Sequence, residues 1–243
     1  MDFTTKFHCD TYPVLSPKRP ELSQNGRTVF ITGGAGGIGL AIARSFVEAG
    51  AARLVLVARR SGNLAEAKYE LEKSTSFNVE VLTYSCDIGD SVGVQHIWDD
   101  LKAKGIDVDV LVLNAAAANT VPQGLAESDL VSKVWSTFEV NVRSALEMTD
   151  VFLKQGRSNG KNIISINTSG IHISPIRPAQ LGYAASKAGL GSLMQGIADL
   201  INPENVQIVS YHPGSVRTEA VLKSKMANAP IAWNSGKQDS YDI

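Results

Sequence analysis

Tyr183 and Lys187 are the residues of this sequence whose types and spacing most clearly suggest chemistry. They are four apart in a segment with apolar residues at helical spacing, so they lie on one face of the predicted helix. Free tyrosine titrates near pH ~10, and a neighbouring ammonium stabilises the phenolate. The pair therefore predicts a general acid–base device; the alternative is a surface pair without a catalytic role.

Two further polar residues are candidates for the same site. The apolar run Ile163–Ile166 predicts a buried strand that is followed by hydroxyls at Thr168 and Ser169. Asn141 lies within a long predicted helix, residues 130–153, beside an apolar stripe. A polar amide in that position is either functional or simply hydrogen-bonded in place.

A glycine-rich turn follows the first predicted strand, Thr28–Thr32. Residues 33–39 read Gly-Gly-Ala-Gly-Gly-Ile-Gly, and the helix predicted over Leu40–Ala49 is closed by Gly50. Glycines let a backbone approach a pyrophosphate, and a helix N-terminus favours its negative charge. Strand, turn and helix together predict a dinucleotide-binding start, whereas the turn alone would indicate only flexibility.

The second predicted strand, Leu54–Val57, bears on the choice of cofactor. An Asp or Glu after this strand usually accepts from the ribose hydroxyl of NAD(H), but here Ala58 is followed by Arg59 and Arg60. Arginine suits a phosphate dianion, so the sequence favours NADP(H) over NAD(H). The alternative is that both arginines are solvated loop charges.

Later strands place more polar residues at the same edge. Asp87 follows the strand Val79–Tyr84 and either accepts from the adenine amino group or caps the helix that begins near Ser91. Asn114 and four alanines follow the strand Val108–Leu113, where small residues leave room for a cofactor or for close helix packing. Strands that alternate with helices predict a Rossmann-like, doubly wound parallel α/β sheet in a single domain, with its site at the carboxyl ends of the strands.

The bulk composition excludes several classes of partner. The chain has 243 residues, a net charge of −1 and 19% charged residues, so we expect no contact with nucleic acid or anionic lipid. The two cysteines have no metal spacing, and we expect no metal. Charged residues near the amino terminus and strand-sized apolar runs predict neither a secretory signal nor a membrane span, so a cytoplasmic protein is expected.

Three regions are predicted along the chain. Residues 1–26 form an irregular arm, 27–222 the nucleotide-binding domain, and 223–243 a short tail without a strand-like apolar run. We therefore expect a fold truncated before its seventh strand, in which the last predicted strand, Val206–Tyr211, is an edge. Lower stability and a pocket open on one side are the expected consequences.

Taken together, the motifs resemble the short-chain dehydrogenase/reductase family from about Gly26 to Thr218. The resemblance is carried by Thr32–Gly39, Asp87, Asn114-Ala-Ala, Asn141, Ser169, Tyr183 with Lys187, and Pro213-Gly214 with Thr218. It implies that Tyr183 is the acid or base of the reaction, that Lys187 lowers its pKa and holds the nicotinamide ribose, and that Ser169 binds the substrate oxygen. Asn141 would support a water that leads protons toward Lys187.

The resemblance also implies cofactor contacts and an oligomer. The implied cofactor residues are Gly33, Gly37, Ile38, Gly39, Arg59, Asp87, Asn114, Tyr183, Lys187, Val216 and Thr218. Ile38 and Gly39 would lie under the pyrophosphate, and Val216 and Thr218 would meet the carboxamide. The Asn141 and Tyr183 helices are expected to pack on a second copy of the chain.

The sequence departs from the family pattern at several points. Asn-Asn-Ala-Gly becomes Leu-Asn-Ala-Ala over residues 113–116, and fourteen residues rather than the commoner thirteen separate Ser169 from Tyr183. Thr168 and Ser174 are less favoured substitutes for Ser169. His172 and His212 have no partner that the sequence identifies, and a structural role is favoured for both.

The predicted function is NADP(H)-dependent hydride transfer between the nicotinamide and a ketone or secondary alcohol. Ile171, Ile173 and Leu181 suggest a small, apolar substrate. The alternative is a cofactor-binding protein with little turnover, because the tail is short. A sugar-nucleotide epimerase of the extended branch is not favoured, since there is no room for a separate substrate domain.

Overall fold

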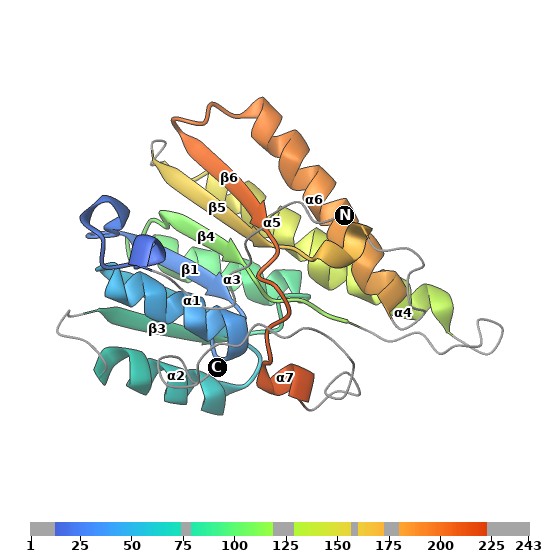
Figure 1. The fold of residues 1–243 in the computed structure, drawn as a ribbon, viewed down its shortest axis with the longest axis horizontal. Coiled ribbons are helices and arrows are strands. Elements are labelled where there is room, and N and C mark those ends of the chain that lie inside the picture. The colour runs from blue at the N-terminus through green and yellow to red at the C-terminus, as the bar shows by residue number, and fades with distance from the viewer. Residues whose placement is uncertain (1–12, 74–78, 119–128, 157–159, 173–179, 223–243) are drawn as a thin grey trace.

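The computed structural model describes residues 13–73, 79–118, 129–156, 160–172 and 180–222. These residues contain a six-stranded parallel sheet in the order β3-β2-β1-β4-β5-β6 (Figure 1). The strands are β1 (Thr28–Thr32), β2 (Arg53–Ala58), β3 (Glu80–Ser85), β4 (Val110–Leu113), β5 (Lys161–Ile166) and β6 (Val206–Tyr211). The strand order reverses between β1 and β4, which is where such sheets bind ligands.

Helices cover both faces of the sheet. They are α1 (Gly37–Glu48), α2 (Ser61–Lys73), α3 (Ser91–Ala103), α4 (Leu130–Phe138), α5 (Ser144–Leu153), α6 (Leu181–Leu200) and the short α7 (Glu219–Leu222). Single turns are η1 (Pro13–Leu15), η2 (Pro20–Leu22) and η5 (Ser169–His172), and η4 (Glu139–Arg143) is a π-helical segment. The arrangement confirms the predicted doubly wound α/β fold.

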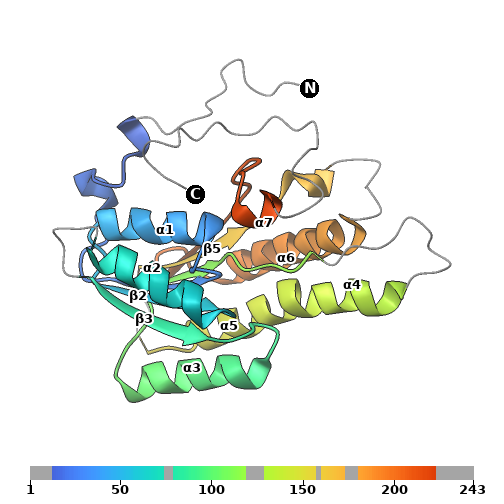
Figure 2. The ribbon, with the colours of Figure 1, turned by 90° about the horizontal axis from the view of Figure 1, so that it is seen from below.

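The core consists of two apolar layers, one on each face of the sheet. One layer joins the sheet to α1 and α2 through residues such as Val47 and Leu71. The other joins it to α3, α5 and α6 through residues such as Trp98, Phe152 and Leu190. Figure 2 shows α1 and α3 on opposite sides of the strands. All five residues of the central strand β1 are buried, as expected for a parallel strand covered on both faces.

The helix predicted over residues 130–153 is not continuous. It is divided into α4 and α5 by the π-helical segment η4, which contains Asn141. A π turn has one more residue than the corresponding α turn, and such turns often mark functional sites. The side chain of Asn141 bonds the backbone of Ala117, a contact that hydrophobic periodicity does not reveal.

The outer strand β6 has one neighbour, β5, among the residues that the structure describes. Val209 and Tyr211 of this strand are 51% and 39% exposed. The tail on which the expected truncation depends, residues 223–243, lies outside the described residues, as do residues 1–12 of the arm.

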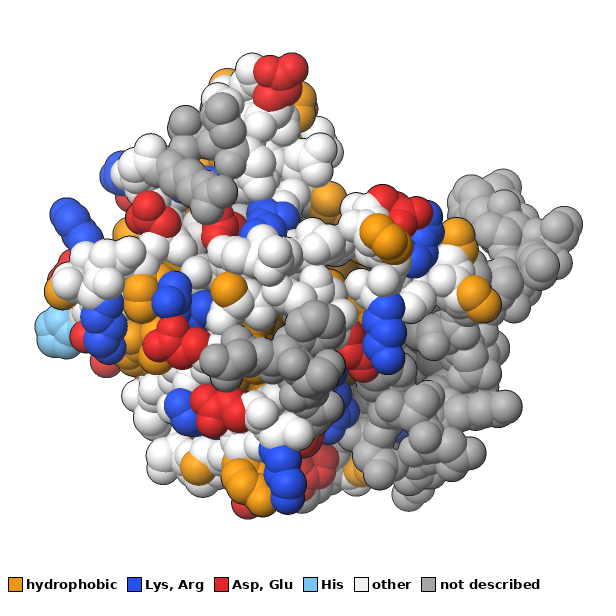
Figure 3. All heavy atoms as spheres, turned by 90° about the vertical axis from the view of Figure 1, so that its left-hand side faces the viewer, with side chains coloured by type: hydrophobic (Ala, Val, Ile, Leu, Met, Phe, Trp, Pro, Cys, Tyr) orange, Lys and Arg blue, Asp and Glu red, His pale blue; other side chains and the backbone are white. Residues whose placement is uncertain are grey.

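Acidic and basic side chains alternate on the described surface shown in Figure 3, without a continuous basic patch. Within the described ranges, no group of His, Cys, Asp and Glu side chains is arranged to hold a metal ion. The helices of those ranges include none with the length and apolar character needed to cross a membrane.

Candidate active site

The Asn141 side chain connects three segments of the chain. Its Oδ1 accepts from the backbone N–H of Ala117 at 2.7 Å, and its Nδ2 donates to the carbonyl of the same residue at 2.9 Å. The other Nδ2 hydrogen is donated to Ser186 Oγ at 2.9 Å. Asn141 is 2% exposed, so this amide joins η4, the segment after β4 and α6 inside the protein.

Ser186 extends this connection to the predicted acid–base residue. Its Oγ donates to the backbone carbonyl of Tyr183 at 2.8 Å while it accepts from Asn141. Lys187, the next residue, is 2% exposed and donates from Nζ to the carbonyl of Ile166 at 2.6 Å. Asn141 and the backbone of Tyr183 are thus joined through Ser186, and Lys187 is bonded to the last residue of β5.

Burial shifts the pKa values of both Tyr183 and Lys187. It lowers the pKa of the Lys187 ammonium from 10.5 to about 8, because the charged form loses its hydration. It raises the pKa of the Tyr183 phenol above 10.0 for the same reason. This direction is opposite to the one that the sequence predicts for Tyr183, since burial, which a motif does not report, determines the shift.

The hydroxyl candidates after β5 differ in their surroundings. Ser169 begins η5 and is exposed, whereas Thr168 Oγ1 accepts from the backbone N–H of Gly170 at 3.1 Å. The Thr168 hydroxyl is therefore part of a local turn, which favours Ser169 as the substrate-facing group. Ile173 and Ser174 lie outside the described residues. His172 is exposed, and burial lowers the pKa of His212.

The glycine turn between β1 and α1 is closely packed against its own backbone. A Cβ at Gly39 would lie 2.2 Å from the carbonyl oxygen of Gly33, so no side chain fits there. Gly33 and Gly37 have φ values of 68° and 52°, which favour glycine. A Cβ at Gly37 would lie 3.1 Å from Thr218 Cγ2, which places the segment after β6 against this turn.

Asn114 lies beneath the same turn. Its Nδ2 donates to the Thr32 carbonyl at 2.9 Å, and a Cβ at Gly39 would lie 2.7 Å from it. Thr32 Oγ1 accepts from the backbone N–H groups of Asn114 and Ala115 and donates to the carbonyl of Val112. These bonds hold the ends of β1 and β4 together where the strand order reverses.

The predicted cofactor residues Arg59 and Asp87 lie near one another at the ends of β2 and β3. Arg59 Nη1 is 3.9 Å from Asp87 Oδ2, and the Arg59 side chain is 77% exposed. The helix cap that the sequence offered as an alternative role for Asp87 belongs instead to Asp90, whose carboxylate accepts from the N–H of Val92. A cavity of about 410 Å³ between β3 and α3 includes Asp87 in its wall.

Sequence reasoning missed Ser186 and named Thr32 only as the first residue of the glycine motif, whereas the hydroxyls of both organise these contacts. Ser186 stands three residues after Tyr183, and a hydroxyl at that helical spacing reaches back to the carbonyl of the preceding turn. Val216 is in the segment that reaches the glycine turn through Thr218, whose Oγ1 also accepts from the N–H of Val221. Ile38 is partly buried in the first turn of α1.

Comparison with known proteins assigns this arrangement to a class. A family model described as short chain dehydrogenase matches residues 27–228. The short chain dehydrogenase/reductase AacuD of Aspergillus aculeatus is 30% identical over 90% of this chain and 74% of its own length. The short chain dehydrogenase mpl6 of Monascus purpureus is 32% identical over 98% of this chain and 84% of its own length. The chain therefore belongs to the short-chain dehydrogenase/reductase family, whose fold binds NAD(P) and whose members are oxidoreductases acting on CH–OH groups.

Solved structures agree with this assignment. L-Sorbose reductase from Gluconobacter frateurii, complexed with NADPH and L-sorbose, is 27% identical with a TM-score of 0.72, over 83% of this chain and 74% of its own. A short chain dehydrogenase from Burkholderia cenocepacia, in complex with NADP, is 26% identical with a TM-score of 0.74, over 85% and 81%. An NAD⁺-bound xylitol dehydrogenase has a TM-score of 0.69 at 22% identity over 79% and 72%, which shows the shared fold alone.

Proposed function

We propose that this oxidoreductase uses NADP(H) to interconvert a ketone and a secondary alcohol on a small, apolar substrate. The observation that carries the proposal is the hydrogen-bond chain from Asn141 through Ser186 to the backbone carbonyl of Tyr183, beside the buried Lys187. Asn141, Ser169, Tyr183 and Lys187 are its proposed catalytic residues. Protein groups that must exchange a proton at a fixed point need such a rigid support.

The residues around the glycine turn suit a dinucleotide. A Cβ added at Gly36 would meet no atom within 4 Å, so the backbone there faces open space. The first N–H groups of α1 follow directly, and the absence of a side chain at Gly39 keeps the turn tight. We assign the pyrophosphate to Gly33, Gly37, Ile38 and Gly39. The nicotinamide group, when bound, supplies or accepts the hydride.

The remaining cofactor contacts are assigned by position. Arg59 is exposed after β2, where it can meet a 2′-phosphate, and Asp87 follows β3 at the adenine end. Asn114 and Thr218 border the turn, with Thr218 next to Gly37, and Val216 is assigned to the cofactor as the residue whose carbonyl accepts from the N–H of Thr218. The 27%-identical reductase complexed with NADPH and the 26%-identical NADP complex support this preference for NADP(H).

In the proposed reduction, the protein binds the carbonyl oxygen and delivers one proton to it. The Ser169 hydroxyl donates a hydrogen bond to that oxygen, and Tyr183 transfers its phenolic proton to it. Tyr183 is protonated at neutral pH and can therefore act as the acid, although burial raises its pKa and makes it a weaker one. The Lys187 ammonium stabilises the resulting phenolate. In the oxidation direction, Tyr183 accepts the proton instead.

Replacing Tyr183 with Phe tests the function directly. We expect NADPH to bind with unchanged affinity, while reduction of a carbonyl panel, followed by nicotinamide absorbance, falls about 10²-fold or more. Thr168→Ser is the matched control, because the Thr168 hydroxyl serves a local turn. Wild-type protein that binds NADPH but turns over no carbonyl would support a cofactor-binding role, and unchanged turnover in Tyr183→Phe would remove Tyr183 from the mechanism.

The chain is proposed to pair with a second copy of itself through α4 and α6. Val131 and Trp135 of α4 are 80% and 63% exposed, and Leu193 of α6 is 37% exposed. Trp135 stacks on Phe138 with ring centroids 5.9 Å apart, which gives α4 a flat aromatic surface. α4 packs directly on α6, so both helices can meet one partner.

Two cysteines in the whole chain favour a reducing compartment, and the cytoplasm is the proposed location.

A further inference from the structure

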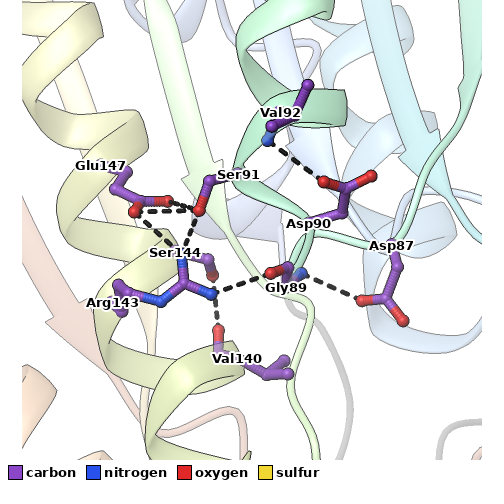
Figure 4. Close-up of polar contacts among 9 residues, drawn as sticks. All are labelled: Asp87, Gly89, Asp90, Ser91, Val92, Val140, Arg143, Ser144 and Glu147. Atoms are coloured by element: carbon purple, nitrogen blue, oxygen red, sulfur yellow. Dashed lines mark hydrogen bonds and ion pairs between the residues drawn. The ribbon is translucent and has the colours of Figure 1, made fainter.

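The turn between β3 and α3 is tied to the helix that carries Asn141 by one guanidinium group (Figure 4). Arg143 Nη2 donates to the carbonyl oxygen of Gly89 at 2.8 Å. Its Nη1 donates to Glu147 Oε1 at 2.9 Å and also to Ser91 Oγ. Ser91 Oγ in turn donates to the Glu147 carboxylate. Arg143 therefore bonds this connection at Gly89 and Ser91, while Glu147 on α5 bonds both Arg143 and Ser91.

Gly89 transmits this contact to Asp87. Its carbonyl accepts from Arg143, and its N–H donates to Asp87 Oδ1 at 3.0 Å. The second carboxylate oxygen, Asp87 Oδ2, lies 3.9 Å from Arg59 Nη1. Gly89 thus links the Arg143 guanidinium to the Asp87 carboxylate, because it bonds the first through its carbonyl and the second through its N–H. This link fixes the orientation of the carboxylate.

The turn also packs closely against η4. A Cβ at Gly89 would lie 3.3 Å from Val140 Cγ2, which is tighter than most such contacts, and 3.4 Å from Asp87 Oδ1. Val140 immediately precedes Asn141, and Arg143 follows it by two residues. The turn that carries Asp87 therefore rests on the same π-helical segment that organises the proposed catalytic residues.

Arg143 matters for the hydrogen bond that it directs to Gly89 rather than for the stability that its ion pair with Glu147 contributes. Arg143 and Glu147 are an i,i+4 pair with side chains 40% and 37% exposed, and pairs of that kind stabilise a protein little. A planar guanidinium can serve a carbonyl and a carboxylate in different directions at once, whereas a lysine ammonium is a single point charge.

We propose that Arg143 is a positioning residue for the cofactor: through Gly89 it holds the Asp87 carboxylate where it accepts a hydrogen bond from the exocyclic amino group of adenine. The proposal rests on the proposed function, because it takes Asp87 as the adenine contact. Arg143 bonds Gly89, Ser91 and Glu147, so it is proposed to act on the cofactor through Asp87 rather than by direct contact.

The test compares NADPH with its deamino analogue, in which hypoxanthine replaces adenine and a carbonyl replaces the amino group. A hydrogen bond to a charged group contributes roughly 1.5–3 kcal/mol, so wild-type protein should bind NADPH about 10- to 100-fold more tightly than the analogue. Arg143→Met and Arg143→Lys should reduce this preference for NADPH over the analogue to about threefold or less, because they weaken the binding of NADPH and leave that of the analogue unchanged. Asp87→Ala should abolish the ratio and serves as the reference variant.

Two further variants separate positioning from general stability. Gly89→Ala leaves every charge in place but presses the turn away from Val140, and it should lower the same ratio. Lys154→Met removes another i,i+4 ion pair, with Asp150, and should keep the wild-type ratio. The melting temperature of each variant is recorded beside its two dissociation constants.

Three outcomes would overturn the inference. The first is that folded Arg143 variants keep the wild-type ratio of the two dissociation constants. The second is that these variants bind NADPH and the analogue equally more weakly. The third is that wild-type protein binds NADPH without preferring it to the analogue. In each of these, NADPH binding and turnover can persist, so the proposed function stands. A wild-type protein that binds neither cofactor would instead refute the proposed function, and the inference with it.

Discussion

Replacing the buried Lys187 with Met should remove a pH dependence from the free energy of unfolding. Burial lowers the pKa of this lysine from 10.5 in the unfolded chain to about 8 in the folded protein. Each pKa unit corresponds to about 1.4 kcal/mol, so keeping the ammonium charged inside the protein costs about 3 kcal/mol.

The sign follows from where the proton is lost. Below pH 8 the lysine is charged in both states, and the folded protein carries the whole cost. Between about pH 8 and 10.5 the folded lysine loses its proton while the unfolded lysine keeps it. The unfolded state then binds more protons, so the free energy of unfolding contributed by Lys187 rises with pH.

Urea denaturation at a series of pH values measures this contribution. From about pH 8 to 9.5 the stability of wild-type protein should rise relative to that of Lys187→Met by about 2 kcal/mol. At neutral pH the variant loses the 2.6 Å hydrogen bond to Ile166 but no longer carries a buried charge. Lys154→Met, whose native side chain is 72% exposed, controls for the change in net charge. Parallel curves for wild-type protein and Lys187→Met would refute the reasoning.

Two further predictions concern the cofactor and the partner. Arg59→Ala should raise the Kd for NADPH about 10- to 100-fold more than that for NADH, because a charge-assisted hydrogen bond to the 2′-phosphate is lost. Arg60→Ala is the matched control. If Arg59→Ala weakens the binding of NADPH and NADH equally, another residue binds the 2′-phosphate. Trp135→Glu should convert a dimer into a monomer by light scattering at micromolar concentration. Val92, 64% exposed on α3 against 63% for Trp135, supplies the control Val92→Glu, and a monomeric wild-type protein would contradict the proposed pairing.

The sequence predicts the strands well because each is a short apolar run buried in a parallel sheet. Predicted and observed bounds agree for Thr28–Thr32 and Val206–Tyr211, whereas β4 begins at Val110 rather than at Val108. The glycine turn was also predictable, because a predicted strand precedes it and a predicted helix follows it, which is the context that the motif requires. These features depend on local pattern and burial, which a single sequence contains.

Features that depend on contacts between distant residues were not predictable. The apolar period across residues 130–153 predicts one helix, but the bond from Asn141 to Ala117 accompanies a π turn. Two aspartates near the start of α3 satisfy a capping pattern, and only the structure shows that Asp90 is the cap. The raised pKa of Tyr183 likewise depends on burial by the folded chain.

The Asn141 amide has a consequence for the order in which the protein folds. Its partners lie 24 residues before it, at Ala117, and 45 residues after it, at Ser186. Closing such distant contacts requires the intervening strands and helices to have settled, and non-local contacts form slowly for this reason. A chain that has built only its glycine turn and first strands has none of these contacts. The proposed catalytic site is thus expected to assemble late in folding, when η4, α6 and the segment after β4 have come together.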